Sequence, residues 1–229
     1  MLKFYFNASP NPTKVALFLE EAGLAYQGMP VDTRKGQQFS ADFLAINPNG
    51  KVPAIVDDDG AVVFDSNAIL LYLAEKTGKF LPAQSPKNRA ELLSWLMFAA
   101  TGVGPFSGQA VHFRHFATEK VPYAHNRYQF EAQRHFTVLD ERLAKHRYMV
   151  GDTYTIVDMD VWGWARMIPF VLGEGAWAKF PNVKRLVDEI TARPAAARAV
   201  ALKDKFTFKA EMDEDARRHM FKHQSLTAA

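Results

Sequence analysis

The chain has 229 residues, of which 48% are hydrophobic and 23% charged, and its formal net charge is +3. This composition is typical of a folded protein with one or two cores, and it excludes a disordered or fibrous chain. The apolar runs are too short to cross a bilayer, and the small, dispersed charge argues against nucleic-acid or membrane partners. No signal-peptide pattern precedes the first predicted strand, so we expect a cytoplasmic protein.

The chain contains no cysteine. Disulfide bonds, thiolate metal sites and a cysteine nucleophile are therefore excluded. Seven histidines remain, among them His112 and His115 on a predicted helix and the later His125 and His135, but no carboxylate stands at a matching spacing. We expect polar histidines on helix faces and no metal site. Any thiol used by this protein must arrive with a ligand.

Strand and helix signals alternate along the first eighty residues. Residues 2–6 and 24–31 predict two strands, and the apolar residues between them recur at helical spacing up to Gly23. A short helix is expected to begin near Ser40. Strand, helix and strand in this order indicate a parallel βαβ unit.

Residues 47–69 carry the most informative pattern in the chain. Lys51-Val52-Pro53 leads into a predicted β-hairpin, residues 54–56 and 61–64, joined by an Asp-Asp-Asp-Gly turn. Asp65-Ser66-Asn67 then opens a helix. A proline before a strand, followed by a polar helix start, suggests a site for an extended peptide that carries a carboxylate. The element order β-α-β-α-β-β-α is that of a thioredoxin-like α/β domain.

From residue 87 onward the sequence predicts helices alone. We expect one helix over residues 89–118 with a break at 101–105, and a second over 122–145. A third is expected over 156–170, after a Thr155–Asp158 capping box. An apolar stripe at 183–190 predicts a fourth helix, and a final helix should begin at Pro194. The last twenty residues are expected to be a loosely attached charged tail. The predicted domains are residues 1–79, a linker at 80–86, and an all-α domain at 87–229.

With these motifs in this order, the chain resembles the cytosolic glutathione transferases over nearly its whole length. Residues 6–11, 35–39, 104–109 and 121–128 further resemble the bacterial nu class of that family. The resemblance implies a homodimer that binds glutathione or its disulfide and reduces disulfides without a cysteine of its own. It implies conjugation of glutathione to electrophiles as an alternative, and a non-catalytic ligand-binding protein as another.

The resemblance also implies a glutathione site. In the family the proline that matches Pro53 is cis, and the Val52 backbone would pair with the cysteinyl part of glutathione. Ser66 would bind the γ-glutamyl carboxylate and Asp65 the ammonium, although the family commonly has Glu there. The glycyl end would meet Gln38 and Lys51. Taken singly, Pro53 could begin an edge strand and Ser66 could be a helix cap.

Thiol activation is expected from the first loop. Ser9 and Asn11 would donate hydrogen bonds to the glutathione thiolate, together with the dipole of the following helix. A turn-forming role is the alternative for Ser9, and Tyr5 is a rival hydroxyl that we expect to be mainly structural. Arg127 would reach the thiol or a second carboxylate, or be a solvated arginine. The predicted co-substrate pocket contains Phe106, Gln109, His112 and Phe113, although the two phenylalanines could equally be core residues.

Overall fold

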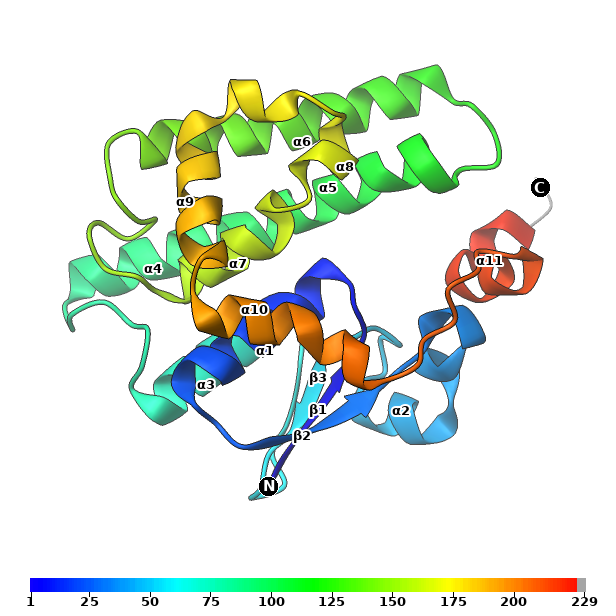
Figure 1. The fold of residues 1–229 in the computed structure, drawn as a ribbon, viewed down its shortest axis with the longest axis horizontal. Helices are drawn as coiled ribbons and strands as arrows, with labels where there is room; N and C mark the ends of the chain where they lie inside the picture. The colour runs from blue at the N-terminus through cyan, green and yellow to red at the C-terminus, as the bar shows by residue number, and fades with distance from the viewer. Residues whose placement is uncertain (226–229) are drawn as a thin grey trace. The chain divides into compact units, whose positions relative to one another are not determined.

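A computed structural model describes residues 1–225, which form two compact units (Figure 1). The first unit combines residues 1–72 with the chain from residue 198 onward, and the second covers residues 73–197. The division falls inside two helices, α3 (Ser66–Thr77) and α10 (Pro194–Ala201). These two units differ from the predicted ranges 1–79, 80–86 and 87–229, because the C-terminal residues associate with the first unit. The predicted division into domains stays a prediction.

The first unit is built on a four-stranded mixed sheet in the order β2-β1-β3-β4. Its strands are β1 (Leu2–Phe6), β2 (Tyr26–Pro30), β3 (Ala54–Val56) and β4 (Val62–Phe64). Strand β1 pairs in parallel with β2 and antiparallel with β3, which in turn forms the predicted hairpin with β4. This confirms the thioredoxin-like α/β order, with β2 shorter than expected at both ends.

Helices α1 (Pro10–Ala22), α2 (Ala41–Ile46) and α3 complete this unit. Helix α1 ends where predicted, because Gly23 adopts a left-handed φ of 68° and its N–H donates to the Leu19 carbonyl. The Ser40 hydroxyl caps α2 by accepting from the Phe43 N–H. Side chains alternate across the sheet, so Tyr5 and Ala54 face Phe43 of α2, while Phe4 and Phe6 face the opposite way.

Up to residue 225 the chain does not form the loosely attached tail that the sequence predicted, and the last four residues of that predicted tail, 226–229, lie outside the described residues. Helix α11 (Glu214–Met220) packs against the short 3₁₀ turn η1 (Thr33–Lys35), as Figure 1 shows in red and blue. Ala216 is fully buried there, and the Asp213 carboxylate caps the helix through the Ala216 N–H. The charged composition was misleading because the charged side chains lie around a small apolar contact.

The second unit is helical among its described residues. Its helices are α4 (Pro86–Phe98), α5 (Gly104–Val111), α6 (Pro122–Leu143), α7 (Ile156–Ala165), α8 (Ile168–Leu172) and α9 (Pro181–Thr191). The predicted core stripe of α9, Val183, Leu186, Val187 and Ile190, is buried. The expected helix 156–170 is wrong in its length, since α7 ends at Ala165. Pro169 lacks an N–H and its ring would clash with the carbonyl four residues earlier.

A π-helical turn replaces the break expected at residues 101–105, and a second one lies further along the chain. The first, η3 (Ala99–Val103), joins α4 to α5, and the second, η4 (His112–Phe116), follows α5. The first wider turn lets the helix continue into α5 while shifting the face that its side chains present, whereas the helix ends after the second, at Ala117. Gly102 is needed in the first turn, because a Cβ there would lie 2.3 Å from the His135 ring. No helix among residues 1–225 is long and apolar enough to span a bilayer.

The predicted capping box is present at the start of α7. The buried Asp158 carboxylate accepts from the Thr155 N–H at 2.8 Å and from the Met149 N–H at 2.7 Å. It therefore satisfies two backbone donors, one in the loop before the helix and one in the preceding turn. The capping box thus ties the preceding turn to the core helix as well as starting that helix.

We predict that Asp158→Ala lowers the free energy of unfolding by about 3 kcal/mol, because it leaves buried N–H groups unpaired. Urea denaturation monitored by tryptophan fluorescence measures this loss. The matched control is Asp152→Ala, at an exposed position six residues earlier, which should change the free energy by no more than about 0.5 kcal/mol. Equal effects of the two substitutions would contradict the proposed tie.

Candidate functional site

The loop that precedes β3 is held by one buried side chain, Asn47. Its amide donates to the Lys51 carbonyl at 2.6 Å, and its oxygen accepts from the Asn49 N–H at 3.0 Å. The Gly50 N–H donates to the Asn47 carbonyl, and Gly50 takes the positive φ that such a turn requires. Asn47 is 2% exposed, so these bonds are shielded from water. The turn over residues 47–51 is therefore held in one conformation, which fixes the direction of the backbone at Val52.

Val52 lies between this loop and β3, and its peptide bond to Pro53 is cis, as the resemblance implied. The Val52 side chain packs against a small core of Val31, Phe43 and Ala54. In the part of the chain that the structure describes, the Val52 N–H and C=O have no hydrogen-bond partner. A half-buried residue with both backbone groups available can pair with an extended peptide as another strand would.

The start of α3 is capped by Asp65. Its carboxylate accepts from the Asn67 N–H at 2.9 Å and the Ala68 N–H at 3.2 Å. Asp65 has a φ of 70°, a left-handed conformation that aspartate tolerates better than most residues. The capping role that was the alternative for Ser66 therefore belongs to Asp65. Ser66 is the first helical residue, where a backbone N–H points out of the helix toward an anion.

A buried lysine supports the same helix start. The Lys14 ammonium of α1 donates to the Asn67 Oδ1 at 2.6 Å, and the Ser66 hydroxyl lies 3.4 Å from that oxygen. All three side chains are buried. A cation close to a helix N-terminus adds to the positive potential that the helix dipole creates there. The site around Ser66 is therefore suited to a carboxylate.

Ser9 is oriented by Asn7. The Asn7 Oδ1 accepts both the Ser9 N–H at 3.0 Å and the Ser9 hydroxyl at 2.6 Å. The Asn7 amide donates to the Thr33 hydroxyl at 3.3 Å, which connects the first loop to η1. Gln38 joins the same network, since its amide donates to the Thr33 carbonyl at 3.3 Å. Two residues that the sequence predicted separately, Ser9 and Gln38, are thus connected through Asn7 and Thr33.

The first turn of α1 restricts which donors can act beside Ser9. Pro10 and Pro12 have no N–H, and the Thr13 N–H donates to the Ser9 carbonyl. Asn11 is therefore the only one of the first three helical residues with a backbone N–H. The backbone N–H groups expected at this helix start are therefore reduced to that of Asn11, and hydrogen-bond donation from Ser9 and Asn11 to a thiolate stays a prediction.

The other predicted residues of the first unit are divided between surface and core. Lys51 is exposed, whereas Gln38 is 4% exposed and its Oε1 is buried without a hydrogen-bond partner. Tyr5 packs against Phe43, with ring centroids 5.8 Å apart, in agreement with a mainly structural role.

In the second unit, Arg127 forms an ion pair with Glu131 across one turn of α6, with an Arg127 Nη1 to Glu131 Oε1 distance of 2.8 Å. Half of the Arg127 side chain is exposed. A hydrogen bond from Arg134, aided by the Arg127 charge, holds the pKa of Glu131 below its usual range. Arg127 is therefore an oriented cation on the surface of α6.

Three of the four residues predicted for a co-substrate pocket belong to one aromatic cluster. The Phe113 ring stacks on Tyr128 with centroids 5.3 Å apart, His112 meets the Phe113 edge, and Phe106 lies 6.4 Å from Tyr128. Gln109 is exposed. Beyond this cluster His135 corrects an expectation, because it is buried and stacks on Phe106 instead of lying on a polar helix face.

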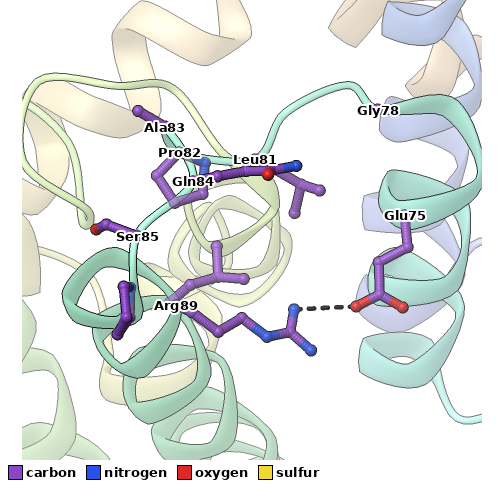
Figure 2. Close-up of a pocket in the computed structure, with 10 residues that line it drawn as sticks. Glu75, Gly78, Leu81, Pro82, Ala83, Gln84, Ser85 and Arg89 are labelled. Carbon is purple, nitrogen blue, oxygen red and sulfur yellow. Dashed lines mark ion pairs between the residues drawn. The ribbon is translucent and has the colours of Figure 1, made fainter.

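The second unit also has a cavity of about 450 Å³ between the end of α3, residues 81–86 and α4 (Figure 2). Arg89 and Glu75 form an ion pair of 2.9 Å beside it, and the rest of its lining is mostly apolar. Both members of the pair are about half exposed. The Ser85 hydroxyl in the lining caps α4 by accepting from the Asn88 N–H, and an exposed ion pair beside a helix cap indicates a structural role for this cavity.

Comparison with known proteins shows the family of this chain. The family model described as the glutathione S-transferase N-terminal domain matches residues 8–76, and the model of the C-terminal domain matches residues 112–194. The chain belongs to the glutathione S-transferase family. In the same family, the disulfide-bond oxidoreductase YfcG of Escherichia coli is 43% identical to it, across 87% of this chain and 94% of that protein. The E. coli disulfide-bond oxidoreductase YghU is 40% identical, across 86% and 73%.

Solved structures of family members share the fold. A glutathione transferase family member from Pseudomonas fluorescens, crystallised with two glutathione molecules, has a TM-score of 0.82 and 35% identity, covering 87% of this chain and 92% of that one. A glutathione transferase from Pseudomonas putida, crystallised with one glutathione disulfide per subunit, has a TM-score of 0.80 and 34% identity, covering 87% and 90%.

Sequence reasoning missed Asn7, Lys14 and Asn47, which position the predicted residues. The Asn7-Ala8-Ser9-Pro10 pattern contains the signal of an Asx turn, in which a side-chain oxygen accepts an N–H two residues later. No comparable local signal exists for Lys14, whose partner Asn67 is 53 residues away. Which of the predicted residues contact a ligand stays a prediction.

We predict that Asp65→Ala destabilises the protein by about 2 kcal/mol, because it removes a helix cap and keeps a left-handed φ without a local hydrogen bond. Asp65→Gly also removes the cap but relieves the backbone, so its loss should be smaller. Urea denaturation of both variants gives the comparison. A glycine variant at least as unstable as the alanine variant would show that the backbone conformation carries no cost.

Proposed function

We propose that this protein binds glutathione and uses its thiolate to reduce small disulfides. The observation that carries the proposal is the Val52 backbone beside cis-Pro53, with both polar groups available just before β3 begins. The absence of cysteine adds to it, because the reactive sulfur must then come from the ligand. The names of the E. coli relatives, both disulfide-bond oxidoreductases, support the same activity.

In the proposed complex, each part of glutathione meets a different element. The cysteinyl backbone pairs with Val52, and the γ-glutamyl carboxylate lies at the start of α3 beside Ser66. Asp65 accepts from the γ-glutamyl ammonium. Its carboxylate already caps α3, and carboxylate oxygens can accept further hydrogen bonds. Gln38 and Lys51 hold the glycyl end, and Arg127 is the proposed contact from the helical unit.

The proposed chemistry begins with formation of the thiolate. A free thiol has a pKa of roughly 8.5, and lowering it by two units requires about 3 kcal/mol of preferential thiolate stabilisation. Ser9 and Asn11 supply hydrogen bonds and α1 its dipole. In the structure the Ser9 hydroxyl donates to Asn7, so its O–H must rotate toward the sulfur when glutathione binds.

The proposed reaction is two successive thiol–disulfide exchanges. The bound thiolate attacks one sulfur of the disulfide, forms a mixed disulfide with glutathione, and releases the other sulfur as a thiolate that takes up a proton. A second glutathione thiolate then attacks the mixed disulfide, giving glutathione disulfide and the second product thiol. The protein supplies position and electrostatic stabilisation, and glutathione supplies both electrons.

A second candidate activity is conjugation of glutathione to an electrophile. The aromatic cluster of Phe106, His112, Phe113 and Tyr128 favours it, because such a surface suits an apolar co-substrate. Binding without catalysis is the remaining alternative.

We further propose a cytoplasmic homodimer. The exposed Val62 and Phe64 on the edge strand β4 support association, since exposed apolar edges are typical of interfaces.

We predict that the unmodified protein reduces 2-hydroxyethyl disulfide with glutathione, and that treating the protein with iodoacetamide leaves this activity unchanged. Alkylation has no cysteine to act on. A coupled glutathione reductase assay measures the rate, with 1-chloro-2,4-dinitrobenzene conjugation measured beside it. Conjugation without disulfide reduction would favour the second candidate, and neither activity would favour a binding protein.

We predict that Ser9→Ala combined with Asn11→Ala raises the pKa of the bound glutathione thiol and lowers kcat by roughly 25-fold at pH 7, because a pKa that rises from about 6.5 to about 8.5 cuts the thiolate fraction from about 0.8 to about 0.03. The pH dependence of thiolate absorbance reports the pKa. The matched comparison is Ser66→Ala, which should raise the Kd for glutathione and leave the thiol pKa unchanged. Wild-type kcat in the double variant would refute the first-loop assignment.

A further inference from the structure

The chain from Phe206 to Ser225, here called the C-terminal segment, is held by the loop that follows β2. The Arg34 guanidinium donates to the carbonyls of Lys209 at 2.9 Å and Ala210 at 2.5 Å. The Lys209 N–H donates to the buried Asp32 carboxylate at 2.7 Å. These bonds use backbone groups of the segment, so they fix its path whatever its side chains are.

The first unit is shaped to receive this segment. Phe206 and Phe208 pack edge-on against Phe6, with centroids 5.4 and 6.0 Å away. Gly28 and Gly36 leave room for it, because a Cβ at Gly28 would lie 3.1 Å from the Phe206 ring and one at Gly36 would lie 2.5 Å from the His219 ring. Gly36 also has a φ of 75°. The segment is therefore a specific part of the fold.

The segment reaches Ser9. A cavity of about 260 Å³ is bounded on one side by Asn7, Ala8 and Ser9 and on the other by Phe208, Lys209 and Met220. We call these last three residues the C-terminal wall. This volume is below the roughly 300–1,000 Å³ of pockets that hold drug-sized ligands. The C-terminal wall therefore narrows the space beside Ser9 from one side.

The same segment contacts the predicted glycyl end of the site. The Gln38 amide donates to the His219 carbonyl at 3.4 Å, and the Lys222 ammonium lies over the Phe39 ring, 3.3 Å from its centroid. These contacts lie on both sides of Met220 in the sequence. They hold the chain on either side of Met220, which is one of the residues that line the cavity.

We propose that the C-terminal wall determines which disulfides this protein reduces, admitting small-molecule disulfides and excluding disulfides on protein surfaces. The inference rests on the proposed function, since it assigns the substrate class of that site. In thiol–disulfide exchange the attacked sulfur must come into contact with the attacking one, and the wall stands beside Ser9, where the bulk of a folded protein carrying the disulfide would meet it.

The test compares kcat/KM for 2-hydroxyethyl disulfide, for the bulkier 5,5′-dithiobis(2-nitrobenzoate), and for an S-glutathionylated protein. We expect the wild type to reduce the first at least 100-fold more efficiently than the third. Met220→Ala should raise kcat/KM for the bulky disulfide at least fivefold, and Met220→Trp should lower it at least fivefold. Both should leave kcat/KM for 2-hydroxyethyl disulfide within twofold of the wild type.

The matched control is Met212→Ala, in the same segment but not in the cavity lining, which should leave all three values unchanged. A chain ending at Ala210 removes α11 and should gain at least tenfold on the glutathionylated protein. Should that shortened chain fail to fold, the two Met220 substitutions decide. Unchanged ratios in both, or a wild type that reduces the protein disulfide as well as the small one, would overturn the proposal. A wild type that reduces none of the three would refute the proposed function instead.

Discussion

The candidate site depends on the buried Asn47 side chain, which bonds both ends of the turn before β3. A peptide-binding edge needs backbone groups that point outward in a fixed direction, and backbone groups lose that direction if the preceding loop moves. Asn47 supplies the constraint from one side. From the other side the core around Phe43 and Ala54 holds the Val52 side chain. Between them the Val52 backbone has no freedom to turn inward, so its N–H and C=O remain at the surface of the site.

The first loop follows the same principle with different chemistry. Asn7 holds Ser9 by two hydrogen bonds and passes the constraint to Thr33 and then Gln38. The Ser9 hydroxyl donates to the Asn7 Oδ1, so this hydroxyl already has a hydrogen-bond partner before any ligand binds. A donor that is already positioned needs a rotation of its O–H and no movement of the chain to reach a new anion. Pro10 and Pro12 remove competing N–H groups from that helix start.

Elements whose causes are local could be predicted from the sequence. The hairpin at residues 54–64, the Gly23 helix end and the Thr155–Asp158 capping box each depend on residues within a few positions of one another. The order of those elements was then enough for the fold. Pro169 could also have been used, since a proline four residues beyond Ala165 forbids one continuous helix. The error in the length of α7 came from following apolar spacing past that proline.

Contacts between distant residues could not be predicted in this way. Lys14 and Asn67 are 53 positions apart, and Arg34 and Lys209 are 175 positions apart. The spacing of charges near the C-terminus indicates solvent exposure, and most of those side chains are indeed exposed. What fixes the C-terminal segment is its backbone, because Arg34 and Asp32 bind peptide groups that every sequence possesses. Amino-acid composition does not indicate such backbone hydrogen bonds. The few apolar residues at the contacts, Phe206, Phe208 and Ala216, are the part of this docking that the sequence does indicate. A charged segment with a few apolar residues at its contacts is therefore compatible with a docked structure, provided that the rest of the chain offers donors and acceptors to its backbone.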